Sequence, residues 1–227
     1  MEKILESFYY SFLYDNRYLY ILEGLKNTLI IALFAVLIGI IIGTIIAITR
    51  NYHENTGKLK VLNFLGKTYV NIIRGTPVIL QLMIIYYVIF KTSDISILIV
   101  GIIAFGINSG AYVAEIIRAG IDSVSKDQLE GGLALGLNYG KCMRYIVLPQ
   151  AIKNILPALG NEFITLIKES SIVSVIGVGD LMYQTQLVQS ATYKGVAPLA
   201  ITMVIYFVLT FTLSKGLNYF EGKMKHE

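Results

Sequence analysis

EGGLALGLNYGKCMRYIVLPQ, residues 130–150, is a polar stretch in a chain that is otherwise rich in apolar residues. It holds Glu130 and four glycines, with no histidine and no metal-ligand spacing. The spacing over Leu129–Leu137 fits a short helix whose glycines thin one side and permit close approach to another surface. Pro149 is expected to stop the helical stretch that follows, because proline lacks an N–H donor and clashes with the preceding turn. The stretch therefore predicts a docking element; an amphipathic helix lying on lipid head groups is the alternative.

The composition indicates a membrane protein. Of the 227 residues, 55% are hydrophobic and 15% charged, and the mean hydropathy is +0.65, whereas a soluble domain carries about 25% charged residues. The net charge is +4, but the basic residues are scattered and form no patch for nucleic acid. The single Cys142 excludes an intrachain disulfide. His53 and His226 lie too far apart to suggest a metal pair or a histidine-based catalytic site.

Five segments are long and apolar enough to cross a bilayer, whose core of about 30 Å requires roughly 20 helical residues. The weakest of them contains Glu162, Lys168 and Glu169, but it is too apolar to lie in water. The sequence therefore predicts an all-α integral membrane protein with one domain, 1–227, and transmembrane helices at about 27–49, 68–90, 95–117, 156–178 and 196–217.

The distribution of basic residues predicts the orientation. Twelve Lys and Arg residues lie on one side of these spans, in segments 50–67, 118–153 and 215–227, and five lie on the other. By the positive-inside rule the N-terminus is outside and the C-terminus is cytoplasmic, so the 130–150 stretch faces the cytoplasm. The outer segment 179–198 is expected to be a polar loop that meets an external binding protein, or simply a solvated loop.

The 130–150 stretch also resembles a known signature. Glu130-Gly-Gly, then Gly136, then Ile146-Val-Leu-Pro149 is similar to the cytoplasmic motif of permease subunits of ATP-binding-cassette (ABC) importers, whose usual form begins Glu-Ala-Ala. The two glycines in place of alanines are expected to make the helix more pliable. Three further blocks resemble the branch that imports polar amino acids of the histidine, glutamine and arginine type: RGTPVILQL (74–82), INSGAYVAEIIRAGI (107–121) and LPQAIKNILPALGNEFITLIKESSIVSVIG (148–177).

The resemblance implies the type I ABC importer permease fold and a coupling helix, within about 123–149, that inserts into a groove on an ATPase subunit. It implies as partners an ATPase pair, an extracytoplasmic amino-acid-binding protein, membrane lipid and a second permease, either a homodimer copy or a related chain. The location would be the bacterial cytoplasmic membrane. The residues expected to couple to the ATPase are Glu130, Gly131, Gly132, Leu135, Gly136 and Pro149.

The chain itself is expected to be neither an enzyme nor a cofactor protein. It contains no GxxxxGK[ST] phosphate loop, so ATP must bind to another polypeptide. Five spans are also few for alternating access, which is commonly built from two related halves.

Charged and polar residues inside the predicted spans mark a candidate substrate site, because such residues usually face a cavity or a partner. A zwitterionic amino acid offers a carboxylate and an ammonium group to the neighbouring Lys168 and Glu169. The alternative is that these two side chains pair only with each other, or with the second subunit. The candidate substrate-binding residues are Lys168, Glu169, Asn108, Ser109, Tyr112 and Gln81.

Other polar residues in the spans have simpler interpretations. Asn108 and Ser109 alternatively cement helix packing, Glu162 is a solvated or gating residue, and Arg74 is a cytoplasmic anchor beside the helix break expected at Gly75 and Pro77.

The function predicted from these features is a permease that moves a polar amino acid, basic or glutamine-like, by alternating access. A proton-coupled secondary transporter that uses Glu169 or Glu162 as a relay is the alternative, but it leaves the coupling motif unexplained. The absence of histidines from the spans argues against an intramembrane hydrolase, and the four matching blocks argue against a channel.

Overall fold

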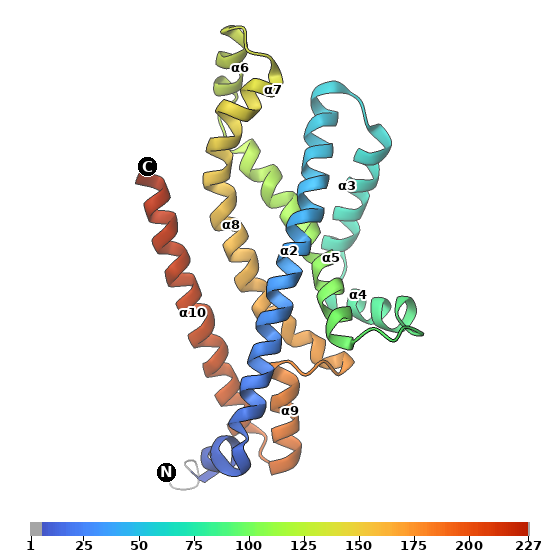
Figure 1. The fold of residues 1–227 in the computed structure, drawn as a ribbon, viewed down its shortest axis with the longest axis vertical. Helices are drawn as coiled ribbons and strands as arrows, with labels where there is room; N and C mark the ends of the chain where they lie inside the picture. The colour runs from blue at the N-terminus through green and yellow to red at the C-terminus, as the bar shows by residue number, and fades with distance from the viewer. Residues whose placement is uncertain (1–5, 227) are drawn as a thin grey trace.

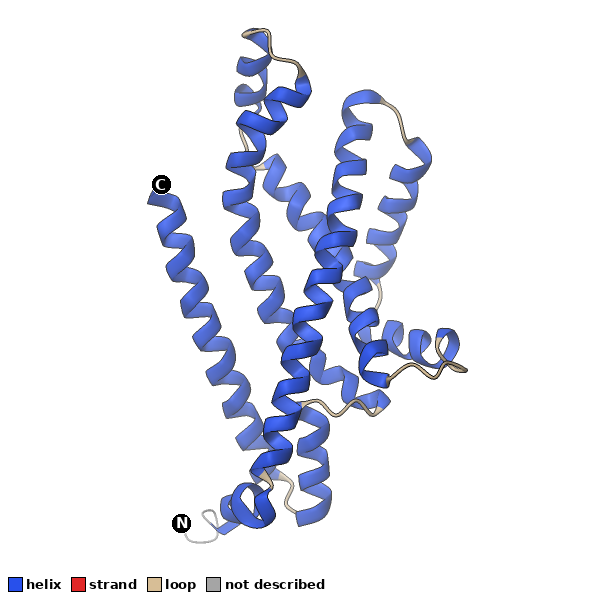
Figure 2. Cartoon of the chain, in the orientation of Figure 1, coloured by secondary structure: helices blue, strands red, loops and turns tan. Residues whose placement is uncertain are grey.

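The computed structural model describes residues 6–226, and these residues form helices and no strand (Figures 1 and 2). The first five residues and Glu227 lie outside the described part. The long helices are α2 (Tyr18–Thr56), α3 (Lys60–Gly75), α5 (Ile97–Asp122), α8 (Leu148–Glu169) and α10 (Val196–His226). The shorter elements are η1 (Tyr9–Leu13), η2 (Tyr14–Asn16), α4 (Val78–Ile84), η3 (Ile85–Ile89), α6 (Lys126–Ala134), α7 (Tyr139–Cys142), η4 (Met143–Val147), η5 (Ser170–Ile176) and α9 (Leu181–Thr192).

Helices α2 and α5 form the most extensive packing contact, because small residues let their backbones approach. A Cβ atom at Gly39 would lie 2.7 Å from Ser109 Oγ, and one at Gly43 would lie 2.7 Å from the backbone nitrogen of Ala114. The hydrophobic core beside this contact is completed by α8 and the turn after it, through buried residues that include Phe105, Ile31, Leu166, Ile167 and Val173. Leucine or isoleucine at either glycine would separate the two helices.

Within residues 6–226, three helices are long and apolar enough to cross a membrane: Tyr18–Thr56, Ile97–Asp122 and Val196–Met224. A fourth candidate is the pair α3 and α4–η3, which is bent by 110°. The predicted break at Gly75 and Pro77 is therefore confirmed, but 68–90 is not one straight helix. The residue before a proline is driven out of the α region, and Thr76 accordingly has an extended conformation (φ −126°, ψ 149°).

Pro149 does not stop a helix, contrary to the sequence prediction. α7, η4 and α8 follow one another without a gap, and Pro149 lies in the first turn of α8. The wider π turn of Met143–Val147 comes directly before it, and a π turn inside a helix accommodates a missing i→i−4 bond. The helix that carries the predicted span 156–178 thus starts earlier, at Leu148, and ends at Glu169, after which a 3-10 turn leads to Gly177 (φ +85°).

The outer segment 179–198 contains helix α9 where a loop was expected. Asp180 caps this helix by accepting hydrogen bonds from the backbone N–H groups of Tyr183 (2.9 Å) and Met182 (3.0 Å). An aspartate at this position satisfies donors that a helix leaves free at its start. The N-cap was a signal available in the sequence.

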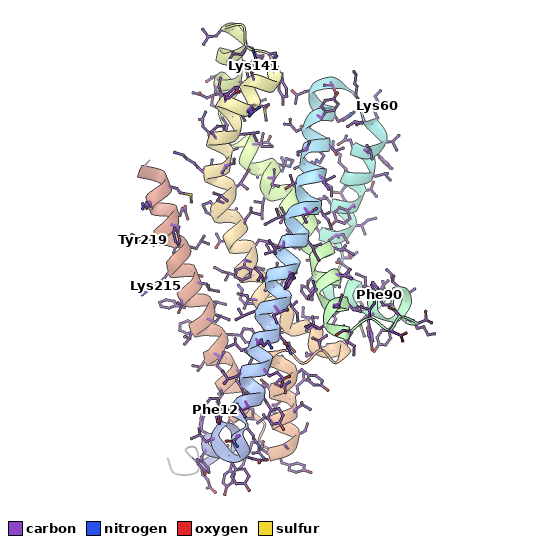
Figure 3. All side chains as sticks on the ribbon, in the orientation of Figure 1. Phe12, Lys60, Phe90, Lys141, Lys215 and Tyr219 are labelled. Carbon is purple, nitrogen blue, oxygen red and sulfur yellow. The ribbon has the colours of Figure 1, made fainter. Side chains whose placement is uncertain are left out.

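The two ends of the long bundle are formed by different elements (Figure 1). α6 and α7 project at one end, and the N-terminal segment and α9 lie at the other. Figure 3 shows Lys60 and Lys141 toward the α6–α7 end and the aromatic Phe12 at the opposite end. The basic segments 50–67 and 118–153, both predicted to be cytoplasmic, therefore lie toward the end of the molecule that carries α6, whereas Lys215 lies part-way along it.

Candidate functional site

Helix α6 contains the first residues of the polar stretch 130–150, and its ends are set by local hydrogen bonds. Ser125 caps the start, where its hydroxyl accepts from the backbone N–H of Asp127 at 3.3 Å. At the end, Gly136 N–H donates to Leu133 O (2.9 Å) and Leu137 N–H donates to Gly132 O (3.2 Å), with Gly136 at φ +85°. This Schellman pattern requires the left-handed conformation that glycine adopts readily. A short helix is confirmed, although it starts and ends three residues before the predicted 129–137.

The two glycines that replace the alanines of the usual motif have different environments. A Cβ atom at Gly131 would have none of the described atoms within 4 Å. A Cβ at Gly132 would lie 2.6 Å from Ile146 Cδ1 and 2.8 Å from Cys142 Sγ. Gly132 therefore allows α6 to pack against α7 and η4, whereas Gly131 faces open space.

The outer surface of α6 presents one strongly exposed apolar side chain. Leu135, directly after the helix, is 85% exposed, and Leu133 is 43% exposed. Glu130 is also exposed on the helix. These side chains are free to contact another molecule. Of the six predicted coupling residues, Pro149 lies apart from the others, in α8.

Tyr139 links the coupling region to α2. Its hydroxyl donates to Asn51 Oδ1 at 2.9 Å and accepts from Asn55 Nδ2 at 2.5 Å. A cavity of about 380 Å³ lies beside this contact and is lined by residues from α2, α5, α6, α7 and η4. Sequence reasoning missed Tyr139, because nothing in the sequence indicates that it lies beside residues more than eighty positions earlier.

Gln81 and Asn108 belong to one hydrogen-bond network at the α3–α4 break. Asn108 Nδ2 donates to Gln81 Oε1 at 2.9 Å. Gln81 Nε2 donates to Ile73 O (2.8 Å) and to both Thr76 O (3.1 Å) and Thr76 Oγ1 (2.8 Å). The amide of Gln81 thereby satisfies carbonyl groups that the break leaves free and ties the break to α5. The two predicted ligands are thus brought together beside non-helical backbone.

Ser109 contacts a different partner on α8. Its hydroxyl, in a fully buried side chain, donates to Glu162 Oε1 at 2.8 Å. This bond connects α5 to α8 inside the predicted membrane region. Glu162, which was interpreted as a solvated or gating residue, is therefore a hydrogen-bonded group between two helices.

The other predicted substrate ligands lie at the end of α8 and in the middle of α5. Lys168 and Glu169 close α8, with Lys168 exposed and Glu169 half-buried. The ion pairs found among the described residues do not join these two side chains to each other. Tyr112 is 37% exposed and packs under the guanidinium of Arg74, whose Cζ lies 5.6 Å from the ring centre.

The remaining charged residues of this region form an ion-pair cluster. Glu115 accepts from Arg50 at 2.5 Å and from Arg118 at 3.0 Å, and Arg74 lies 3.6 Å from it. Arg50 and Arg118 were missed as site residues, although their place at the ends of predicted spans was a signal. Within the described residues no three His, Cys, Asp or Glu side chains are grouped to hold a metal ion.

Comparison with known proteins identifies the family. Residues 35–226, from the middle of α2 to the end of α10, match the family of binding-protein-dependent transport system inner membrane components. The chain belongs to this family. The permease is 41% identical over 208 residues to the arginine transport system permease protein ArtQ of Bacillus subtilis (strain 168), which covers 91% of this chain and 93% of the relative.

Two further similarities agree with that family. The permease is 34% identical to the glutamine transport system permease protein GlnP of Escherichia coli (strain K12), over 90% of this chain and 93% of that one. It also superimposes on the crystal structure of an amino acid ABC transporter with histidines, with a TM-score of 0.83 and 45% identity over 90% of this chain and 94% of the other.

These similarities confirm several predictions. The chain is an all-helical permease with the type I ABC importer fold, it is a component of the inner membrane, and ATP hydrolysis belongs to a separate subunit. The family implies an ATPase and a substrate-binding protein as partners. The proton-coupled alternative and the intramembrane hydrolase gain no support.

Proposed function

We propose that the permease forms the membrane pathway of an ATP-driven importer for a polar amino acid, either basic or glutamine-like. The observation that carries this proposal is α6, a short helix that projects at one end of the bundle with Leu135 85% exposed. The names of the relatives, which refer to arginine and glutamine, support the substrate class. The expected substrate, an amino acid, carries both a carboxylate and an ammonium group.

We propose five crossings, with the N-terminus outside and the C-terminus cytoplasmic. In addition to the four candidate spans, α8 and η5 would form the crossing whose charges face protein or the transport path instead of lipid. The basic residues near α6 support this orientation. The bend of 110° after α3 fits a crossing that is interrupted where it meets the pathway.

The proposed substrate site uses both charges at the end of α8. Lys168 would bind the α-carboxylate and Glu169 the ammonium group, by charge-assisted hydrogen bonds. Asn108 and Gln81 would provide polar contacts to the substrate at the helix break. Tyr112 would line the transport path on α5. Ser109 would hold the side chain of Glu162 in place through their hydrogen bond. The exposure of Lys168 in a single chain agrees with a site completed when a second permease packs against it.

The proposed mechanism is alternating access driven by ATPase closure. α6 would dock into a groove on the ATPase through Glu130, Gly131, Leu135 and Gly136, and ATP binding would move it. The succession of α7, η4 and α8 is a continuous helical path from the coupling region to Lys168 and Glu169. A helix transmits axial displacement with little loss, so movement at α6 would reach the substrate site.

The proposed complex contains two permeases, two ATPases and an external binding protein. A homodimer of the permease is favoured, and a heterodimer with a related chain is the alternative. The permease would need no cofactor of its own, with ATP held by the partner. Segment 179–198, with α9, lies at the end opposite α6 and would meet the binding protein.

The test is ATP hydrolysis and uptake by the complex purified gently from native membranes, with a panel of amino acids and candidate binding proteins. One amino acid should raise the hydrolysis rate. Lys168→Met and Glu169→Gln should raise the KM for that amino acid at least tenfold. Lys153→Met, at an exposed lysine near the other end of α8, should change nothing. Uptake that persists without ATP in a proton gradient would overturn the proposal.

A further inference from the structure

A basic cavity lies between α2, α3 and α5, next to the proposed substrate path, because its lining residue Arg74 packs against Tyr112. Its volume is about 330 Å³. Its lining contains four cationic side chains and a single carboxylate, and it consists of Arg50, Lys67, Val70, Asn71, Arg74, Glu115 and Arg118.

The carboxylate does not neutralise the cavity. Glu115 Oε1 accepts from Arg50, and Glu115 Oε2 accepts from Arg118 Nη2 at 3.0 Å and Nε at 3.1 Å. Arg118 also donates to Asp122 at 2.6 Å, and that carboxylate is not part of the lining. Even with Asp122 included, two positive charges remain unbalanced. Four cations held this close repel one another, so an additional anion would stabilise the arrangement.

Several donors at the cavity remain free to bind an anion. The Nε atom of Arg50 is buried and has no hydrogen-bond partner among the described residues. Lys67 takes part in none of the ion pairs found in the described part of the chain. Arg74 reaches Glu115 only at 3.6 Å. A buried donor without a partner costs free energy, which a bound acceptor would recover.

The position of the cavity relative to the membrane indicates where its ligand comes from. Arg50 directly follows the predicted span 27–49, Lys67 directly precedes the span that begins at 68, and Arg118 directly follows the span that ends at 117. All three boundaries belong to the predicted cytoplasmic side. With these predicted boundaries, the cavity would lie near the level of the lipid phosphates of the inner leaflet. Phe64, one helical turn before Lys67 on α3, is 68% exposed and offers an apolar surface to an acyl chain.

We propose that this cavity binds a phosphate group through Arg50, Lys67, Arg74 and Arg118. The phosphate is that of an anionic phospholipid head group from the cytoplasmic leaflet, or free phosphate from the cytoplasm. Guanidinium groups bind phosphate oxygens in pairs of parallel hydrogen bonds, and basic pockets between transmembrane helices on the cytoplasmic side suit lipid head groups. A bound phosphate would connect α2, α3 and α5 at their cytoplasmic ends.

The test compares lipid binding by the complete transporter and by a charge-reduced variant. Lys67→Gln with Arg74→Gln removes two exposed cations of the cavity. Lys58→Gln with Lys60→Gln, at exposed residues outside the lining, removes equal charge and is the control. In nanodiscs of phosphatidylcholine with phosphatidylglycerol, native mass spectrometry should find one retained phosphatidylglycerol per permease in the wild type and the control. Retention of phosphatidylglycerol by the cavity variant should be at least tenfold weaker. Lys67→Arg alone, which keeps the positive charge, should retain the lipid as the wild type does.

A second measurement separates the two sources of phosphate. In nanodiscs of phosphatidylcholine alone, millimolar inorganic phosphate should raise the melting temperature of the wild type above that of the cavity variant if the free anion is the ligand. If the lipid is the ligand, phosphatidylglycerol should raise the melting temperature of the wild type above that of the cavity variant, and inorganic phosphate should not. Equal loss of lipid by the control variant, or no difference in either measurement, would overturn the proposal. Neither readout depends on amino-acid transport, so the result stands apart from the proposed function.

Discussion

Restoring the two alanines of the usual coupling motif should have opposite effects, because Gly131 and Gly132 have different surroundings. In a helix, alanine is more favourable than glycine by about 0.8–1.0 kcal/mol. At Gly131 nothing described in the structure opposes a methyl group, so Gly131→Ala should stabilise α6 by about 1 kcal/mol. With RT near 0.59 kcal/mol, local opening of the helix should become about fivefold rarer.

At Gly132 the same methyl group meets packed atoms. It would lie 2.6 Å from Ile146 Cδ1 and 2.8 Å from Cys142 Sγ. Overpacking typically costs about 1–3 kcal/mol, which exceeds the gain in helix propensity. Gly132→Ala should therefore increase local opening of α6 severalfold. Adding Ile146→Val, which removes Cδ1, should recover part of the loss.

Hydrogen–deuterium exchange of the amides of α6, measured by mass spectrometry on the full chain in nanodiscs, reports these openings directly. Exchange should slow about fivefold in Gly131→Ala and accelerate in Gly132→Ala, while the amides of α5 remain unchanged. Equal shifts in the same direction for both variants would refute the reasoning, because they would show that propensity alone governs α6 and that the contact with Ile146 and Cys142 has no effect.

Three further outcomes are expected. Gly136→Ala places a side chain at φ +85°, which costs about 1–2 kcal/mol, and should accelerate exchange at the end of α6; an unchanged rate would exclude the left-handed cap. Tyr139→Phe removes the hydrogen bonds to Asn51 and Asn55, each contributing about 1 kcal/mol, and should lower the amino acid transported per ATP hydrolysed while hydrolysis continues; an unchanged ratio would argue against this link. Burial raises the pKa of Asp180 from 3.8 to about 6. Protonation of Asp180 therefore adds about 3 kcal/mol to the free energy of unfolding below pH ~4. This contribution is lost as the pH rises through about 6. Melting temperatures between pH 4 and 7 should show this decline, and Asp180→Asn, which keeps a capping oxygen, should reduce it.

Sequence reasoning predicted the features that depend on local pattern. The apolar runs predicted helices at α2, α5 and α10, and the motif around Glu130 predicted a short helix outside them. The break at Gly75 and Pro77 was also predictable, since proline restricts the residue before it. These signals depend only on neighbours along the chain.

The errors came from competing local signals. Pro149 was expected to end a helix, but a proline in a first helical turn lacks only a donor that the helix does not use there, and the π turn before it absorbs the remaining mismatch. α9 was expected to be a loop because its segment is polar, although the N-cap Asp180 indicated a helix start. Gly136 was interpreted as a site of close approach, whereas its positive φ shows that it terminates α6.

The sequence by itself determined the solvent, the helical class and the family, because composition, periodicity and motif order are properties of the chain alone. Only the tertiary structure decided which polar residues meet. It placed Gln81 against Asn108, Ser109 against Glu162, and Tyr139 against Asn51, and it gathered four cations around Glu115. Such pairs are separated by 27 to 88 residues, and their meeting depends on how the helices pack together, which no local stretch of sequence specifies.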